Sequence, residues 1–237
     1  MSSEPEFRGL HLVVTGASGA LGAAVARLLL ARGATCHLPV RRPLPAAAFG
    51  EPGAVEARIA TGVDLGDERS VKDFYAGLPE LWASVHCAGG FAMAPLAETA
   101  LADLSRMVST NLASTFLCCR EAAKVIRAGR GGGRLVNVAA RPALEPRTGA
   151  GMAAYAASKA AVAALSVALA EELAPEGIWV NAVAPSILDT PANRAAMPEA
   201  DASRWPTPEE IARTIAFLAS PDNACTRGAI VPVYGRT

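Results

Sequence analysis

The stretch Leu10–Gly33, LHLVVTGASGALGAAVARLLLARG, decides the fold of this chain. It begins with an apolar run of six residues, typical of a buried strand, and ends with an apolar-rich helical segment. Between them lie Gly16, Gly19 and Gly22. A glycine turn between strand and helix is the context that a dinucleotide fingerprint requires. The glycines let the backbone approach a pyrophosphate, and the helix N-terminus supplies N–H donors and the positive end of its dipole.

The next segment bears on the choice of dinucleotide. A second strand is expected over Ala34–Val40, and a dinucleotide site meets the adenosine ribose where that strand ends. A carboxylate at this point would favour NAD, but the sequence continues with Arg41 and Arg42. Guanidinium groups match the oxygens of a 2′-phosphate. The sequence therefore favours NADP(H) over NAD(H); the alternative is a solvated arginine pair before a proline-rich loop at 43–53.

The rest of the chain alternates strand-like and helix-like segments. Further strands are expected at 55–61, 81–87, 135–139, 178–184 and 229–233, and helices at 67–77, 101–128, 152–172 and 208–219. The stretches 140–151 and 187–205 are expected to be loops. This alternation predicts an α/β fold with a parallel sheet covered by helices on both faces. No internal boundary or repeat is evident, so residues 1–237 are expected to form a single domain.

Composition excludes several classes of protein. The 237 residues include 22 basic and 22 acidic side chains, a formal net charge of zero, which argues against nucleic acid or anionic membrane as a main partner. Apolar runs such as Ala160–Ala170 are too short to span a membrane, and the N-terminus has no signal-peptide core. Five scattered cysteines and three isolated histidines predict free thiols in a reducing cytoplasm and no metal site.

The helix expected at 152–172, MAAYAASKAAVAALSVALAEE, carries a second motif. Tyr155 and Lys159 are four residues apart and therefore lie on one face of the helix, about one turn apart. They can be a surface pair on an ordinary helix, or a proton-donating phenol beside an ammonium. In the second case the cation favours the phenolate and lowers the pKa of Tyr155 toward working pH.

Taken in order, these motifs resemble the classical short-chain dehydrogenase/reductase family over nearly the whole chain. The resemblance is carried by Thr15 to Gly22, Asp64, Ala88-Gly89, Asn111, Tyr155-x-x-x-Lys159 and Pro185 through Thr190. It implies a single Rossmann-type, doubly wound parallel sheet of about seven strands, with a nicotinamide cofactor bound across its carboxyl edge.

The resemblance also implies a role for each matching residue. It places Gly16, Ser18, Gly19 and Leu21 at the pyrophosphate, Asp64 and Leu65 at the adenine, Ala88 and Gly89 at the ribose region, and Leu188 and Thr190 at the nicotinamide amide. Lys159 would bind the nicotinamide ribose and tune Tyr155. Asn111 would kink its helix and hold a water on the proton relay. The alternative for Asn111 is a helix-surface amide, and for Thr190 it is an N-cap before Pro191.

Four positions depart from the family pattern. Ala20 replaces the middle glycine of T-G-x-x-x-G-x-G, and we expect the turn to tolerate its methyl group. His86-Cys87 stands where the family has Asn-Asn, and Cys87 is expected to be a packing residue. Ser186 follows Pro185 in place of glycine and is expected to be a loop serine. The family's catalytic serine is missing, because the aligned positions are Ala140 and Pro142.

The missing serine shapes the functional hypothesis. In carbonyl reduction this hydroxyl stabilises developing charge on the substrate oxygen, and losing such a donor costs on the order of 10² in rate. We expect an NAD(P)H-dependent enzyme that transfers hydride to a C=O or C=N centre of a small substrate, with Tyr155, Lys159 and Asn111 as catalytic residues. The segment 188–205 and the Gly89-Gly90-Phe91 triplet resemble dihydropteridine reductases, which lack the serine. The alternatives are a dihydropteridine reductase proper and a catalytically weak NADPH-binding sensor.

Two further expectations concern the substrate loop and assembly. The loop at about 187–207 is expected to close over the substrate, with Met197 and Trp205 as its apolar side chains. Positions Ala160–Ala170 are apolar nearly all round, so that helix is expected to be buried on every side. One side would face the sheet and the other a second subunit. The chain would then be a homodimer or homotetramer formed through the helices of Asn111 and Tyr155.

Overall fold

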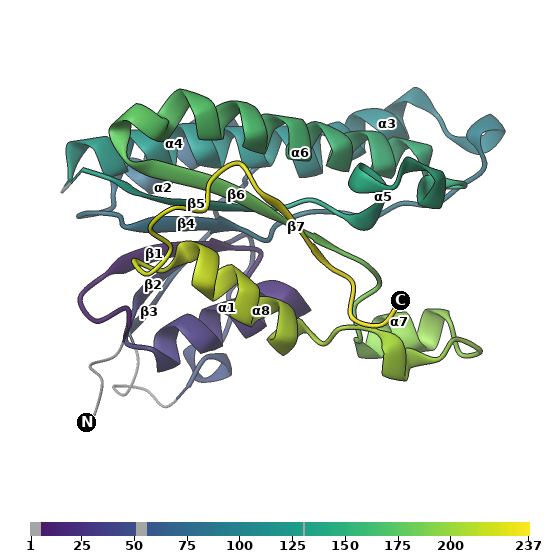
Figure 1. Cartoon of the computed structure of the whole chain (residues 1–237), viewed down its shortest axis with the longest axis horizontal. Helices are drawn as coiled ribbons and strands as arrows, with labels where there is room; N and C mark the ends of the chain where they lie inside the picture. The colour runs from purple at the N-terminus through teal and green to yellow at the C-terminus, as the bar shows by residue number, and fades with distance from the viewer. Residues whose placement is uncertain (1–5, 51–55, 130) are drawn as a thin grey trace.

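The computed structural model describes residues 6–50, 56–129 and 131–237, and its centre is one parallel sheet (Figure 1). Its seven strands lie in the order β3-β2-β1-β4-β5-β6-β7, and every strand pair is parallel. The strands are β1 (His11–Thr15), β2 (Thr35–Val40), β3 (Glu56–Thr61), β4 (Ala83–His86), β5 (Gly133–Val138), β6 (Ile178–Pro185) and β7 (Ile230–Val233). The strand order reverses between β1 and β4, the position where such sheets bind ligands.

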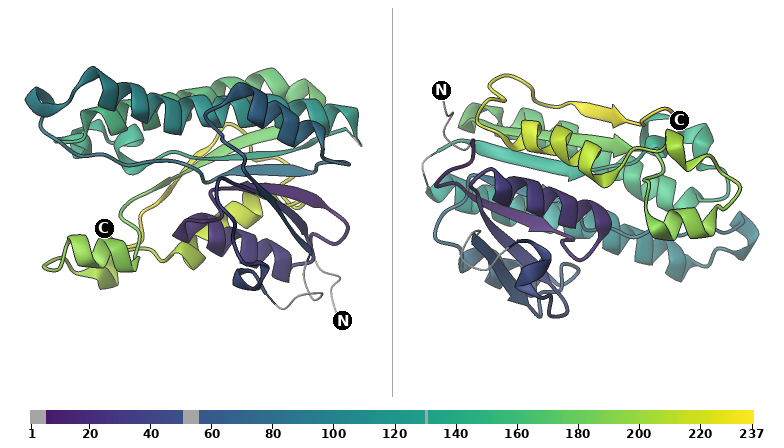
Figure 2. Two further views of the ribbon diagram at one scale, coloured as in Figure 1. Left: turned by 180° about the vertical axis from the view of Figure 1, so that it is seen from behind. Right: turned by 90° about the horizontal axis from the view of Figure 1, so that it is seen from below.

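Helices cover both faces of the sheet, as predicted. They are α1 (Ala20–Ala31), α2 (Glu68–Ala76), α3 (Leu101–Met107), α4 (Ser114–Ala128), α5 (Arg141–Leu144), α6 (Ala153–Leu173), α7 (Pro191–Ala196) and α8 (Pro208–Ala219). Helices α1 and α8 lie together on one face, and α2, α4 and α6 cover the other (Figures 1 and 2). Helices α5 and α7 directly follow β5 and β6, so both lie at the carboxyl end of the sheet.

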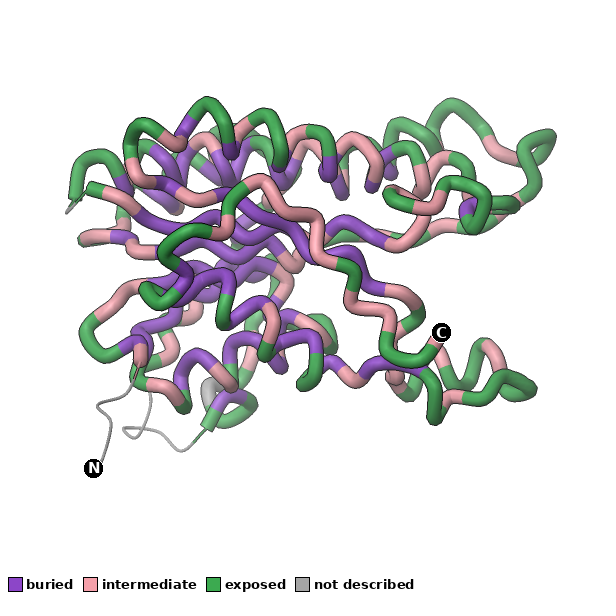
Figure 3. Tube along the Cα trace, viewed as in Figure 1, coloured by how far each residue is buried: buried purple, intermediate pink, exposed green. Residues whose placement is uncertain are grey.

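The two faces have separate apolar cores, seen as buried tube on either side of the strands (Figure 3). Val14 and Ile215 are fully buried between the sheet and α1 and α8. Leu135 and Ile126 are fully buried between the sheet and the opposite helices. Each such side chain contributes about 1.5–3 kcal/mol through removal from water. The strands therefore read as continuous apolar runs because both of their faces are covered.

Three segments differ from the sequence prediction. The helix expected at 101–128 is interrupted by a π-helical segment, Val108–Ala113, between α3 and α4. The loop expected at 140–151 contains α5 and a 3-10 helix, Pro146–Gly149. The loop at 187–205 contains α7 and a 3-10 helix, Ala202–Arg204. The α5 and α7 helices each have proline in the first turn, where its missing N–H costs nothing, and they are too short to show periodicity.

Smaller differences occur between β2 and β3. The proline-rich loop at 43–53 includes a 3-10 turn at Ala46–Ala48. Its residues 51–53, and the expected start of the third strand at Val55, lie outside the described residues.

In the single chain, helix α6 is buried on the side that faces the sheet, and the side expected to face a second subunit is partly exposed. Val162 and Ser166 are fully buried toward the sheet, whereas Val167 on the outer side is 43% exposed. Within the described residues, one segment, Ala153–Glu176, has the length and apolar composition of a membrane span. In this fold that segment is α6 with its 3-10 extension, and it packs along β6.

Candidate active site

The turn between β1 and α1 allows very little space for side chains. Gly16 has φ +70°, and a Cβ at this residue would lie 2.6 Å from the backbone nitrogen of Ala88. A Cβ on Gly22 would lie 2.2 Å from the carbonyl oxygen of Gly16. Both positions therefore require glycine. Gly19 is less restricted, with a nearest contact of 3.4 Å, and α1 begins at the exposed Ala20, so the turn accommodates that methyl group as predicted.

A cavity of about 980 Å³ lies along this turn and the carboxyl ends of the strands beside it. Nine residues predicted to bind the cofactor line it, namely Gly16, Ser18, Gly19, Arg41, Arg42, Asp64, Leu65, Ala88 and Gly89. Six other predicted site residues do not line it, namely Leu21, Asn111, Tyr155, Lys159, Leu188 and Thr190. Leu21 and Leu188 pack against the core on the α1 side instead.

Sequence reasoning missed part of the cavity wall. Ser109, Thr110 and Ser114 line it from the π-helical segment and the first residue of α4. The resemblance predicted a kink in the helix at Asn111, but no local pattern in this stretch distinguishes π from α geometry. Cys87 also lines the cavity, although it was expected to serve only in packing. Burial raises the pKa of its thiol to about 12, so the thiol stays protonated and is a poor nucleophile.

The cavity is cationic where β2 ends. Arg41 and Arg42 are exposed, and no ion pair joins either of them to an acidic side chain within the described part of the chain. Across the cavity, Asp64 accepts a hydrogen bond from the Gly66 N–H at 2.9 Å, which fixes its carboxylate. Two guanidinium groups at one end of a glycine-lined cavity fit a phosphorylated dinucleotide.

Asn111 joins the β4–α3 turn to α6. Its Oδ1 accepts from the Gly90 N–H at 2.8 Å, and its Nδ2 donates to the Gly90 carbonyl at 3.1 Å. The same Nδ2 donates to Ser158 Oγ at 2.9 Å, and that hydroxyl donates to the Tyr155 carbonyl at 2.7 Å. Asn111 is fully buried within the π-helical segment. The alternative that it is a helix-surface amide is wrong.

Lys159 lies beneath the same turn. Its Nζ donates to the Val138 carbonyl at 2.7 Å, at the end of β5. A Cβ on Gly89 would come within 2.8 Å of Asn111 Oδ1 and 3.3 Å of Lys159 Nζ, so glycine is required here as well. Burial lowers the pKa of the Lys159 ammonium to about 8.

Tyr155 lies one turn before Lys159 on α6, as the spacing predicted. Its ring packs edge-to-face with Phe91, with centroids 5.0 Å apart and an interplanar angle of 75°. Burial raises the pKa of the phenol to about 12, so the expected lowering is wrong for this structure. The ammonium that was expected to lower it instead contacts the carbonyl at the end of β5, and removal from water disfavours the phenolate.

No hydroxyl side chain stands at the end of β5. Ala139 and Ala140 are both buried there, and Ala140 precedes the first residue of α5. Thr148 carries the one hydroxyl between residues 139 and 151, and its Oγ1 donates to the Glu145 carbonyl at 2.8 Å. The serine expected for this family has no substitute in this segment.

A buried chain of polar side chains runs behind the site. Tyr75 OH, Ser84 Oγ and His86 Nε2 follow one another at 2.8 Å each. His86 Nδ1 lies 2.7 Å from Asn137 Oδ1, and Asn137 Nδ2 donates to Ser166 Oγ at 2.9 Å. Because Ser166 donates onward to a helix carbonyl, it must accept from the amide, and His86 must then donate from Nδ1. Burial lowers the pKa of His86 to about 4, so this neutral tautomer persists.

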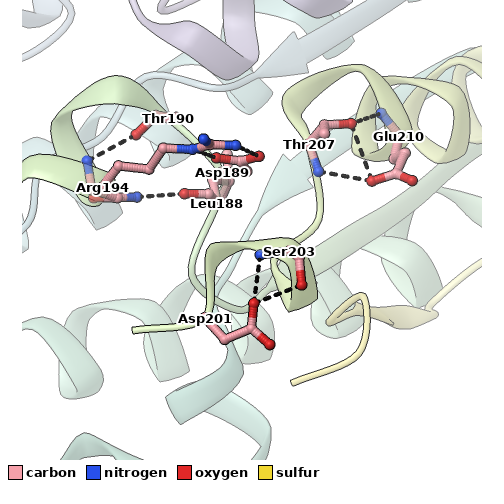
Figure 4. Close-up of polar contacts among 9 residues, drawn as sticks. Leu188, Asp189, Thr190, Arg194, Asp201, Ser203, Thr207 and Glu210 are labelled. Atoms are coloured by element: carbon pink, nitrogen blue, oxygen red, sulfur yellow. Dashed lines mark hydrogen bonds and ion pairs between the residues drawn. The ribbon is translucent and has the colours of Figure 1, made fainter. Parts of the chain in front are cut away.

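The loop at 187–207 is held by several hydrogen bonds, among them those of Arg194 with Asp189 and of Thr207 with Glu210 (Figure 4). The Asp189 N–H donates to the Pro206 carbonyl at 2.9 Å, which joins the two ends of the loop. Arg194 donates two hydrogen bonds to the Asp189 carboxylate, and Thr207 forms a capping box with Glu210 at the start of α8. Thr190 Oγ1 accepts from the Asn193 N–H, so Thr190 is an N-cap of α7 here.

The two apolar side chains expected in the loop differ in how far they are buried. Trp205 is buried, whereas Met197 is half-exposed. Ser186 is a loop serine, as predicted, and its hydroxyl donates to the Tyr234 carbonyl.

The parallel sheet, the glycine turn and the Tyr155–Lys159 pair together define a class of dinucleotide-binding protein, and comparison of the chain with known proteins identifies the family. Residues 10–201 match the family model described as short chain dehydrogenase. The chain belongs to this family, and it is an oxidoreductase of the short-chain dehydrogenase/reductase type.

Individual relatives are similar over nearly their full length. The cis-4-hydroxycyclohexanecarboxylate dehydrogenase of Sinomonas cyclohexanicum is 34% identical, with 94% of each chain covered. The D-threitol dehydrogenase of Mycolicibacterium smegmatis is 30% identical over 99% of this chain and 96% of its own. A Beutenbergia cavernae structure, described as an NAD(P)-dependent gluconate 5-dehydrogenase with NADP bound at low occupancy, has 28% identity, a TM-score of 0.86 and 98% coverage of both chains.

Proposed function

We propose that this oxidoreductase is an NADPH-dependent reductase of a small C=O or C=N substrate, with Tyr155 as the proton donor. The observation that supports this most directly is the arrangement of Asn111 and Lys159 at the Gly89–Gly90 turn after β4, with Tyr155 one helical turn before Lys159. Hydrogen bonds to Gly90, Ser158 and Val138 hold them there at 2.7–3.1 Å. Neither a dihydropteridine reductase proper nor a catalytically weak sensor is favoured by the relatives described above.

The residues around the cavity fit a dinucleotide. Gly16 and Gly22 permit the tight turn after β1, Gly16, Ser18 and Gly19 line the cavity where a pyrophosphate would lie, and the two arginines at the end of β2 suit a 2′-phosphate. A reduced nicotinamide, when bound, supplies the hydride that adds to the electrophilic carbon of the substrate. We assign binding of the nicotinamide part of the cofactor, which lies beyond the cavity, to Lys159, Leu188 and Thr190. We also propose that the loop at 187–207 closes over the substrate.

Tyr155 can complete the reduction because its phenol holds its proton at neutral pH. As the carbon gains hydride, the π electron pair of the C=O or C=N bond moves to the heteroatom. That atom then takes the phenolic proton. Lys159 stabilises the resulting phenolate through its charge. Asn111 holds a water on the proton relay through which the phenol regains a proton from solvent. Without a serine at Ala140, Tyr155 is the main hydrogen-bond donor to the substrate atom.

Substitution of Tyr155 tests this role. Tyr155→Phe keeps the ring that packs on Phe91 but removes the donor, so NADPH affinity should stay within about twofold while turnover falls by 10² or more. Turnover is followed by loss of NADPH absorbance and affinity by NADPH fluorescence. Undiminished turnover in this variant would remove Tyr155 from the mechanism.

We also propose that the chain assembles as a homodimer or homotetramer through the surface of α4 and α6. Phe116 on α4 and Val167 on α6 are 44% and 43% exposed, so each of these helices presents a large apolar side chain to solvent. Size-exclusion chromatography with light scattering tests this, and a monodisperse monomer would contradict it.

A further inference from the structure

Large apolar side chains stand exposed around Tyr155. Phe91 and Met93, in the turn between β4 and α3, are 62% and 64% exposed. The Phe91 ring contacts the Tyr155 ring, and the methyl group of Met93 would lie 3.2 Å from a Cβ on Gly151, just before α6. The Ala94 N–H donates to the Gly151 carbonyl at 2.9 Å, which holds this turn against the start of α6.

Two further apolar side chains are exposed on the segments that follow β5 and β6. Leu144 of α5 is 39% exposed and Ile187 is 40% exposed. Helix α5 packs on α6, and Arg141 of α5 lies over the Tyr234 ring at 4.9 Å. The carbonyl of Tyr234 accepts from the residue just before Ile187, which brings that loop to α5. We call the four side chains Phe91, Met93, Leu144 and Ile187 the apolar mouth.

Two of the charged groups next to the apolar mouth are paired. Arg141 Nε donates to Glu145 Oε2 at 2.8 Å while its guanidinium stacks on Tyr234. Asp189 is likewise paired with Arg194 by two hydrogen bonds. An anionic substrate would have to break one of these pairs to gain Arg141 or Arg194 as its partner. A neutral substrate would leave both pairs intact. Arg147, in the 3-10 helix after α5, is exposed and is a further cation that an anionic substrate could reach.

The position of the mouth limits what can occupy it. Because the Phe91 ring packs on the Tyr155 ring, a substrate whose heteroatom reaches the phenol would lie next to Phe91. Large exposed apolar side chains beside convergent polar groups are typical of small-molecule sites.

From this arrangement, and resting on the proposed function, we propose that the substrate is an uncharged, mainly apolar ring ketone or imine. Its ring lies on Phe91 and Met93, and its oxygen or nitrogen faces Tyr155. The balanced reaction is ketone plus NADPH plus a proton giving the secondary alcohol plus NADP⁺. The substrate carbon is reduced, the nicotinamide is oxidised, and the proton comes from the phenol.

Three ketones test the substrate class. They are 4-tert-butylcyclohexanone, which is apolar, 4-oxocyclohexanecarboxylate, which is an anion of similar size, and dihydroxyacetone, which is polar. Binding is measured by calorimetry with NADP⁺ present, where no hydride is available, and turnover is measured with NADPH. The apolar ring should bind at least about tenfold more tightly than either competitor, and kcat/KM should follow the same order.

Variants link that preference to the mouth. Phe91→Ser and Met93→Ser should each weaken binding of the apolar ring by about tenfold and leave NADPH affinity unchanged. Phe217→Ser is the matched control, because Phe217 is 48% exposed on α8, on the opposite face of the sheet. It should change neither value.

The outcomes separate this inference from the proposed function. Tighter binding of the carboxylate, lost in Arg141→Gln or Arg147→Gln, would overturn the inference and leave the reductase assignment intact. Unchanged binding in Phe91→Ser would also overturn it, as would a fall in oligomer size in that variant, because the mouth would then be a contact between copies. NADPH binding without turnover of any ketone or cyclic imine would defeat the proposed function itself.

Discussion

Substitution of Gly22 by alanine gives the sharpest test of how the glycine turn works. The new Cβ would lie 2.2 Å from the Gly16 carbonyl oxygen, and contacts under 3.0 Å essentially never occur. The backbone of the turn must therefore move by about 1 Å, and overpacking of this kind costs about 1–3 kcal/mol. Because 1 kcal/mol corresponds to roughly 2–4 °C in a chain of this size, Tm should fall by about 2–12 °C.

Gly19→Ala is the matched control in the same turn. Gly19 has φ −95°, and its nearest contact would be 3.4 Å, so alanine fits without displacement. Its Tm should change by no more than about 2 °C. Gly22→Ala should bind NADPH at least about tenfold more weakly, because the moved carbonyl belongs to Gly16 at the cavity wall. Scanning calorimetry and NADPH fluorescence titration measure both effects. Equal Tm and affinity in the two variants would refute the reasoning.

Three other predictions follow from the charged and titratable groups. Arg41→Ala removes a charged partner worth about 1.5–3 kcal/mol, so NADPH should bind roughly 10- to 100-fold more weakly while NADH binding is little changed. Arg213→Ala, on α8 outside the cavity, is the control. Equal losses of affinity for both dinucleotides would contradict a 2′-phosphate contact. The pKa of Lys159 near 8 means that its charge is lost above that pH, so the rate of reduction should fall as pH rises through about 8, and a flat profile from 7 to 10 would argue against the role of the ammonium. Burial lowers the pKa of His86 from 6.5 to about 4, so between these pH values the unfolded chain binds a proton that the folded chain does not. The folded state therefore has up to about 3 kcal/mol of stability above pH 6.5 that is lost as pH falls toward 4. Urea denaturation should show a shallower pH dependence in His86→Gln than in the unsubstituted chain, and identical slopes would exclude this contribution.

Much of the fold was predictable because its signals are local. The glycine spacing of Leu10–Gly33 and the alternation of strands and helices depend on neighbouring residues, and they led to a parallel sheet covered on both faces. The four-residue spacing of Tyr155 and Lys159 likewise fixed their shared helix face. The nine cavity residues named in advance all follow strand ends, where chain order alone places them at one edge.

Tertiary structure alone decided how the side chains meet. His11 Nδ1 lies 2.9 Å from His37 Nε2 on the adjacent strand, although the two histidines are 26 residues apart in the sequence. Asn111 finds Gly90 and Ser158 only because a π-helical segment turns it inward.

Burial also decided the electrostatics of the site. The pKa of Tyr155 rises although its spacing from Lys159 suggested a fall, because the ammonium meets the Val138 carbonyl and the phenol is shielded from water. Sequence determines periodicity and backbone freedom through neighbouring residues. Contacts between distant residues, and the desolvation that sets their pKa values, arise only when the sheet order and packing bring those residues together.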